Sequence, residues 1–385
     1  MEHLPIEVIG NILSWLEDAR DVVIASVACR KWREAYRTHL HTLAFNSNDW
    51  PGYRDITASQ LEILITQTIF QTTGLQNLSI LMDDVDEFNA ATVIAWLMYT
   101  RGTLRRLFYK VRTSPNVNIL EICGRQKLEI LAVAHRSITG VEPNFQKFPC
   151  LKSLSLSYVS ISDLDLRLLL TACPKLECLE LVDPEITISD AQMTLELSSP
   201  TLKEYLCTLK YFKFDDVIVI HLDICETVDN LEVVDVSSYA IFWTKFYQMI
   251  SRSSKLRKLR LWDVAFDDEY EVIDLETIAV CFPQLNHLSL RYELRNGVMH
   301  YGLQGSSNLE TVRVLELGWT VINDLFYHWV EELLKRCPNL RKMIIFGVVS
   351  EAKSHEECQI LANFTSPMVQ LMRKYIQVEV QFEYE

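Results

Sequence analysis

The chain has 385 residues, of which 49% are hydrophobic and 23% are charged, and its formal net charge is -14. This charge argues against a uniform nucleic-acid-binding surface, because phosphate contacts need clustered Lys and Arg. Eleven Gly and eleven Pro are few for this length. That scarcity argues against a Gly-rich dinucleotide-binding enzyme and predicts long runs of regular secondary structure, as two or three domains or as one repeat array.

The first forty residues predict a small helical module. Pro5 and Glu7 suit the first turn of a helix, because a helix needs no N–H there and a carboxylate complements the helix dipole. One apolar stripe is formed, at three- and four-residue spacing, by Val8, Ile9, Ile12, Leu13 and Leu16. A polar break at 17–21 separates this helix from a second helical run at 22–27.

This stretch resembles an F-box over about residues 3–40. The resemblance rests on Leu-Pro-x-Glu-Val-Ile-x-x-Ile-Leu-x-x-Leu from Leu4 onward, then Asp21-Val22, then Ala25-Ser26-Val27-x-Cys29-Arg30-x-Trp32-Arg33. Val22 departs mildly, because Leu is usual there. The resemblance implies a three-helix module that binds the Skp-type adaptor of a cullin ubiquitin ligase.

A module of about 40 residues buries too little apolar area to be stable alone, so its surplus apolar surface is expected to need a partner. The residues expected to contact the adaptor are Leu4, Pro5, Val8, Ile9, Leu13 and Val27, with Trp32 as an aromatic anchor. The alternative is that several apolar residues, notably Ile12, Leu16 and Trp32, only hold the three helices together.

A link at 46–55 and an amphipathic helix at 58–70 precede a pattern, Leu-x-x-Leu-x-Leu, that recurs eleven times. The copies begin at Leu75, Leu104, Leu128, Leu151, Leu176, Leu209, Leu231, Leu256, Leu285, Val312 and Leu340. Most starts lie 22 to 31 residues apart, which is the long end of the leucine-rich-repeat period and leaves room for a helix in each repeat.

The expected fold is therefore α/β: an N-terminal three-helix F-box followed by a leucine-rich-repeat solenoid with a parallel concave sheet and convex helices. We assign residues 1–45 to the F-box, 46–74 to a linker and helix, and 75–385 to about eleven repeats. Pro200-Thr-Leu202 and Thr208-Leu209 both resemble the start of a repeat, but they lie only seven residues apart. We expect a lost or shortened repeat at 200–210, with a kink near 204–207.

The residues between the leucines are expected to face outward, onto the surface that such solenoids use for binding. Two adjacent repeats place a basic and aromatic cluster there, made of Lys258, Arg260, Trp262, His287 and Arg291. Our hypothesis is that this cluster captures an acidic or phosphorylated segment of a target protein. The alternative is that nearby acids, such as Asp263 or those at 267–269, neutralise it.

Neither a catalytic site nor a cofactor is expected. The sequence has no Gly-rich phosphate loop, no His-Glu-x-x-His and no Gly-x-Ser-x-Gly. The ten cysteines lack Cys-x-x-Cys spacing, so we expect reduced, buried thiols and no metal site. We see no secretory signal and no apolar run long enough to span a bilayer, so a cytoplasmic or nuclear location without a membrane partner is expected.

The resemblance, closest in style to plant F-box/LRR-repeat proteins, implies a substrate-recognition adaptor of an SCF-type cullin ubiquitin ligase. Such a chain is not an enzyme; it binds the Skp-type adaptor and captures a protein target for ubiquitination. Two alternatives stay open: a receptor that senses a small hormone, and a protein-interaction scaffold without a ligase role. The first is weaker, because the sequence shows no dense ring of basic residues for a polyanionic cofactor.

Overall fold

The computed structural model describes residues 4–384 apart from 17, 125–126, 142–147, 189–193, 197–207, 218–220, 224–227, 239, 242, 267–271, 293, 296–297, 304, 306, 320–323 and 348–354. The chain divides into two compact units. Unit 1 comprises Met1–Ser189 with Pro200–Tyr205, and unit 2 comprises Asp190–Ser199 with Leu206–Glu385.

Unit 1 begins with the three helices α1 (Ile6–Leu13), α2 (Ala19–Ser26) and α3 (Arg30–His39). Gly10 lets α1 approach the end of α3 closely, since a Cβ at this position would lie 2.6 Å from the His39 carbonyl oxygen. Helix α2 starts at Asp18, whose side chain accepts a hydrogen bond from the Arg20 amide at 2.7 Å.

A parallel sheet follows the three helices in unit 1. Its neighbouring strands, in order, are β1 (Thr42–Asn46), β2 (Asn77–Leu81), β4 (Arg106–Lys110), β6 (Ile130–Ile138), β7 (Ser153–Ser162) and β8 (Cys178–Val182). The end of β7 also pairs with β9 (Glu185–Thr187), and β3 (Phe88–Asn89) pairs with β5 (Thr113–Ser114).

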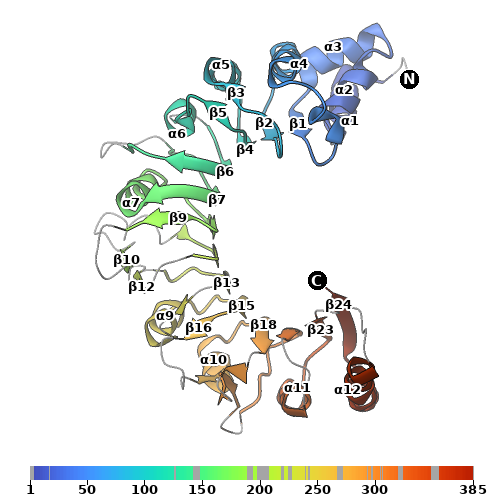
Figure 1. Cartoon of the computed structure of the whole chain (residues 1–385), viewed down its shortest axis with the longest axis vertical. Helices are drawn as coiled ribbons and strands as arrows, with labels where there is room; N and C mark the ends of the chain where they lie inside the picture. The colour runs from blue at the N-terminus through green and yellow to red at the C-terminus, as the bar shows by residue number, and fades with distance from the viewer. Residues whose placement is uncertain are drawn as a thin grey trace. The chain divides into compact units, whose positions relative to one another are not determined.

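The helices between these strands lie along one side of the unit 1 sheet (Figure 1). They are α4 (Ala58–Phe70), α5 (Ala90–Thr100), α6 (Ile119–Cys123) and α7 (Asp163–Thr171). Each of them starts at a polar residue whose side chain accepts a backbone N–H of the first turn; these residues are Thr57, Asn89, Asn118 and Ser162. The caps fix where each repeat turns from strand to helix.

The neighbouring parallel strands of unit 2 are, in order, β11 (Tyr211–Asp215), β13 (Val233–Ser237), β15 (Lys258–Trp262), β18 (His287–Tyr292), β22 (Val314–Trp319), β23 (Lys342–Gly347) and β24 (Glu379–Tyr384). Its helices are α9 (Trp243–Ile250), α10 (Leu275–Cys281), α11 (Asp324–Arg336) and α12 (His355–Lys374).

Short strand pairs connect the repeats of unit 2. The parallel pairs are β10 (Thr194–Glu196) with β12 (His221–Asp223), β14 (Ala240–Ile241) with β16 (Ala265–Phe266), and β17 (Ile273–Asp274) with β21 (Tyr301–Gly302). The strands β19 (Leu294–Arg295) and β20 (Val298–Met299) pair antiparallel.

The expected α/β class, with N-terminal helices followed by a parallel sheet of repeats, is confirmed. Every Leu-x-x-Leu-x-Leu copy lies on a strand, from β2 to β23, and its second and third apolar residues are buried, as Leu154 and Leu156 show at 0% exposure. The strands β1 and β24 of the parallel sheet were not predicted, and neither were the short strands such as β3, β9 and β17. The expected kink near 204–207 lies outside the described residues.

Candidate functional site

The N-terminal helices bury one part of their apolar stripe and expose another. Ile9 and Leu13 are fully buried, with Val22, Ala35 and Tyr36 as further core residues. The Tyr36 hydroxyl donates to the Thr68 carbonyl oxygen at 2.8 Å, which joins α3 to α4. Burial raises the pKa of this hydroxyl to about 12, so it stays a donor.

In the structure, some of the residues that we expected to contact an adaptor are exposed and others are buried. Val8 and Val27 are 39% and 60% exposed, and Pro5 is exposed as well. Leu4 and Trp32 are half-buried. Ile9 and Leu13 face the helix core, so neither side chain is open to a partner. The converse holds for Ile12, which we considered a helix-packing residue and which is 38% exposed.

Three exposed apolar residues were not singled out from the sequence. Trp15 is 85% exposed, Ile24 is 54% exposed and Val23 is 37% exposed. The exposure of Trp15 could have been expected from helical spacing, because Val8, Ile12 and Trp15 follow each other at intervals of four and three residues. An exposed set of this kind on one small module is typical of a protein-binding surface.

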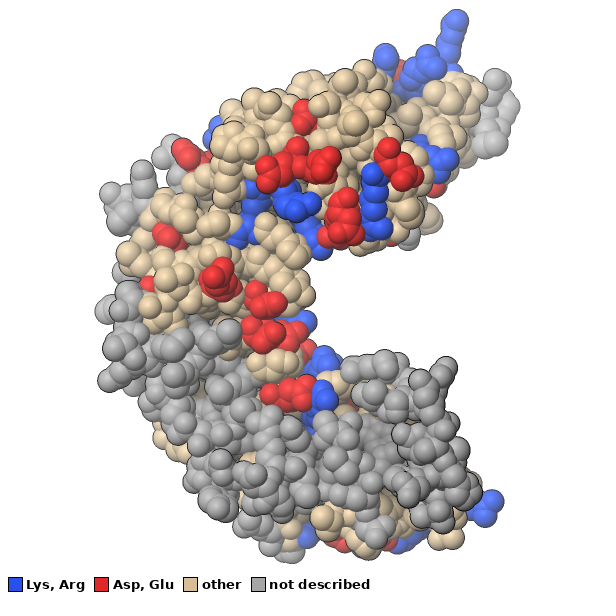
Figure 2. All heavy atoms as spheres, viewed as in Figure 1, with Lys and Arg blue, Asp and Glu red and all other residues tan. Residues whose placement is uncertain are grey.

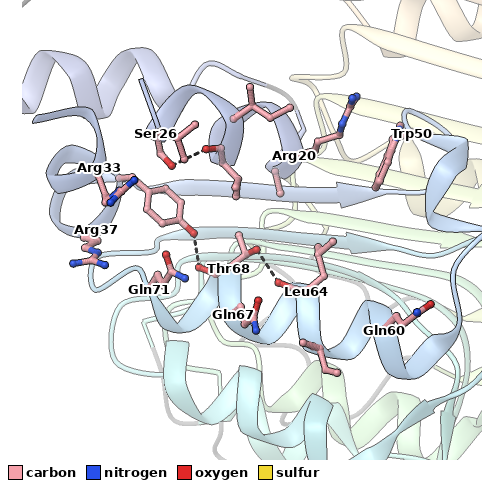
Figure 3. A pocket seen from close by; sticks show the side chains of 16 residues that line it. Arg20, Ser26, Arg33, Arg37, Trp50, Gln60, Leu64, Gln67, Thr68 and Gln71 are labelled. Atoms are coloured by element: carbon pink, nitrogen blue, oxygen red, sulfur yellow. Dashed lines mark hydrogen bonds between the residues drawn. The ribbon is translucent and has the colours of Figure 1, made fainter. Parts of the chain in front are cut away.

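A groove of about 560 Å³ lies between α2 and α3 on one side and α4 on the other. Val23, Ile24 and Val27 contribute apolar surface from α2, and Ile63 contributes it from α4. Figure 3 shows Arg33 and Arg37 of α3 facing Gln71 of α4, while Arg20 and Trp50 lie at the other end. None of its sixteen lining residues is acidic, so the groove is apolar at its wall and positive at its margin.

The second candidate surface is the predicted cluster in unit 2, which the strand register assembles. Lys258 of β15 is paired with His287 of β18, and Arg260 is paired with Ser289. Arg291 follows on β18, and its side chain lies against the position of Gly318 on β22. The five predicted residues thus lie on two neighbouring strands, as the spacing indicated.

Acidic side chains from the flanking strands pair with these basic groups. Arg260 lies 3.6 Å from Asp235, and Arg291 forms an ion pair with Asp263. Glu316 lies 2.7 Å from His287 Nε2 and 4.0 Å from Lys258 Nζ. Burial alone would raise the pKa of Glu316, but the hydrogen bond and charge of His287, with help from Ser289 and Lys258, outweigh it and lower the pKa to about 2.

Trp262 is part of this assembly and only 5% exposed. Its indole N–H donates to Ser289 Oγ at 2.7 Å, the Arg260 guanidinium lies 4.1 Å from its ring centroid, and Phe346 packs edge-on at 5.0 Å. The ring therefore orders the cluster and presents little surface to a partner. That differs from the expectation that Trp262 belongs to the outward binding surface.

Charges of both signs alternate across this part of the sheet. In strand register, Lys213 is followed by Asp235, Arg260, Ser289 and Glu316. On the face shown in Figure 2, described Lys and Arg side chains likewise lie beside Asp and Glu. The acid Asp263, named as a neutralising candidate, does pair with Arg291; residues 267–269 lie outside the described part of the chain.

Within the described residues there is no group of three His, Cys, Asp or Glu side chains arranged to hold a metal ion. Among those residues, too, no helix is long and apolar enough to cross a bilayer. Cys123, Cys173 and Cys337 are buried free thiols.

Two family models match the chain. Residues 1–43 match the F-box-like family, and residues 106–232 match the LRR repeats of FBD-associated F-box protein At5g56370. The first match coincides with the three N-terminal helices, and the second lies within the parallel strands.

Curated relatives define the class of protein further. The chain is 67% identical to F-box/LRR-repeat protein At1g67190 of Arabidopsis thaliana, with both chains covered in full. It is 22% identical to F-box protein At1g10780 of the same plant, over 73% of this chain and 65% of the relative. The chain belongs to the F-box/LRR-repeat protein family, whose members are generally adaptors rather than enzymes.

The alignment with At1g67190 has one further feature. It spans 419 positions, which is 34 more than the chain has residues. The loss at 200–210 stays a prediction.

Proposed function

We propose that the chain is the substrate-recognition subunit of an SCF-type cullin ubiquitin ligase, acting in the cytoplasm or nucleus. Its N-terminal helices bind a Skp-type adaptor, and its repeat sheet captures a protein target. The membership of the F-box/LRR-repeat family supports this role in general terms. The observation that carries the specific proposal is the exposed apolar set Trp15, Ile24 and Val27 on the small N-terminal module.

The adaptor surface is best tested at Ile24, which is more than half exposed and lines the groove of Figure 3. Ile24→Glu removes apolar area from an interface and would bury a charge there, so we expect at least about a 30-fold loss of affinity, or about 2 kcal/mol. The measurement is titration calorimetry of the full chain against a purified Skp-type adaptor.

A matched control is Leu164→Glu, because Leu164 is 57% exposed on α7, away from the three N-terminal helices. The control is expected to bind like the wild type, and circular dichroism shows whether both variants keep the fold. Equal affinity for Ile24→Glu and the wild type would refute this docking surface, and absence of binding by the wild type would refute the adaptor role itself.

Target capture is proposed for the outward face of the unit 2 sheet, at Lys258, Arg260, His287 and Arg291. Because their partners are Asp235, Asp263 and Glu316, the surface fits a target segment of alternating charge better than a uniformly acidic one. Replacing Lys258 and Arg260 with Glu would remove the Arg260 partner of Asp235 and one of the two basic partners of Glu316, as well as alter the surface.

A charge exchange avoids that difficulty. Arg260→Asp combined with Asp235→Arg keeps the internal ion pair and reverses the pattern that a partner meets. We expect a loss of stability of about 1–2 kcal/mol, because the exchange takes the Arg260 guanidinium away from the Trp262 ring, and loss of targets in proximity labelling under proteasome inhibition. Undiminished labelling of the same targets would exclude this face as the capture surface.

A further inference from the structure

Arg136 occupies a position that belongs to the apolar core in the other repeats. It follows His135, a residue with positive φ at the end of the regular part of β6. In the described repeats with the same backbone turn, the next residue is a buried Val or Pro: Val85, Val159, Pro184, Val217 and Val264. Arg136 is paired in register with Val159, and it is itself only 8% exposed.

The guanidinium of Arg136 is surrounded by neutral acceptors. Its Nη1 donates to Thr113 Oγ1 at 3.0 Å and to the Asn116 side-chain oxygen. Its Nη2 donates to the Tyr109 hydroxyl at 2.8 Å and to the Val111 carbonyl. The remaining donor, Nε, is buried without a hydrogen-bond partner, and none of the described carboxylates forms an ion pair with this arginine.

Packing alone does not account for a cation at this position. A buried charge without a counter-charge destabilises a fold, and Val serves the same position in neighbouring repeats. Arg136 is one of the residues that line a pocket of about 150 Å³, between the segment from Asn116 to Leu120 and the end of β6. This volume equals that of about five water molecules, which is enough for one phosphate or carboxylate group.

The rim of the pocket is polar and open. Ser137 and Thr139 of the β6 end are exposed and supply hydroxyl donors, and Asn116 donates to the Ser137 carbonyl at 3.2 Å. A small anion there would meet a preformed positive charge in a site that is shielded from bulk water on one side. Such charge-assisted contacts are the strong ones for oxyanions.

We propose that this pocket binds a small oxyanion, a phosphate or carboxylate group, and that Arg136 is the cation that the anion neutralises. The site is separate from the adaptor surface and does not depend on the proposed ligase role. The anion has two chemically equivalent sources, a free ion and a phosphorylated side chain of a bound protein.

The test is the thermal unfolding of the full chain in rising inorganic phosphate, with chloride at matched ionic strength as reference. Phosphate stabilises proteins generally. The informative quantity is therefore the difference between the wild type and Arg136→Val in the rise of the unfolding temperature that phosphate causes. The wild type is expected to gain about 2–5 °C more than this variant when phosphate reaches about twenty times its dissociation constant. Arg105→Val, which removes an exposed arginine paired with Glu129, is expected to respond like the wild type.

A second variant keeps the test decisive if Arg136→Val does not fold. Ser137→Glu places a carboxylate at the rim, so it is expected to raise the unfolding temperature without phosphate and to abolish the specific response. An O-phosphoserine arm distinguishes the sources: a larger shift than with phosphate assigns the anion to a phosphorylated protein, and an equal shift assigns it to a free ion. Identical phosphate responses of the wild type, Arg136→Val and Ser137→Glu would overturn the proposal. Phosphate would then be an adventitious ion only.

Discussion

Replacing Glu316 by Gln removes the acid that pairs with His287 and Lys258 while it keeps the size and a hydrogen-bond acceptor. Glu316 is the best-placed residue for measuring the energy of the charge assembly on the unit 2 sheet, because its side chain is only 13% exposed. Solvent therefore screens its interactions less than those of a surface pair.

The magnitude follows from the pKa of this carboxyl group, which is lowered from 4.5 to about 2. A group whose pKa is lower in the folded state stabilises the fold above its unfolded pKa and loses that contribution as the pH falls through the folded pKa. A shift of about 2.5 units corresponds to about 3 kcal/mol at pH 7. About 2 kcal/mol of it is expected to remain at pH 3.5.

The assay is urea unfolding of the wild type and Glu316→Gln at several pH values between 7 and 3.5. We expect the variant to be less stable by about 3 kcal/mol at pH 7 and the difference to shrink toward acid. Glu332→Gln is the matched control, because Glu332 pairs with Lys335 at the surface and is 48% exposed; its effect is expected to stay below about 1 kcal/mol. A difference that is small at pH 7, or that does not change with pH, would refute the reasoning.

Two further predictions concern packing and thiol chemistry. Gly10→Ala is expected to destabilise the N-terminal helices by about 1–3 kcal/mol, because the new methyl group would lie 2.6 Å from the His39 carbonyl oxygen; an unchanged thermal unfolding curve would contradict this. Burial raises the pKa of Cys123 and of Cys337 to about 12, so both thiols are expected to resist iodoacetamide at pH 8 in the folded protein and to react in urea. Mass spectrometry of the alkylated peptides decides this, and rapid native labelling of either would show that its surroundings are open.

The repeats could be predicted because their signal is local. Each Leu-x-x-Leu-x-Leu copy combines a two-residue period with a repeat spacing, and both are visible in any one stretch of sequence. The strands β1 and β24 alternate too, with Leu43 and Phe45 buried in the first. They were missed because one lies directly after the predicted F-box and the other has no Leu-x-x-Leu-x-Leu to mark it.

The adaptor surface could be predicted only in part. The apolar residues from Val8 to Leu13 cover a broad arc of α1, and their hydrophobicity does not say which edge of the helix meets α3. The packing of α3 against α1 decides this, since it buries Ile9 and Leu13 and leaves Val8 and Ile12 exposed. In unit 2 the register was predictable, but the acids Asp235 and Glu316 come from other repeats and enter only through the sheet.

The paired charges on the unit 2 sheet have a consequence for recognition. Partly buried ion pairs often stabilise a fold no more than apolar residues would, so we propose recognition as a further reason for their presence here. The alternation from Lys213 to Glu316 leaves little net charge but fixes the position of each sign through strand register. If this face captures a target, as we propose, a uniformly acidic segment would meet repulsion at Asp235 and Glu316, and a uniformly basic one at Lys213 and Arg260.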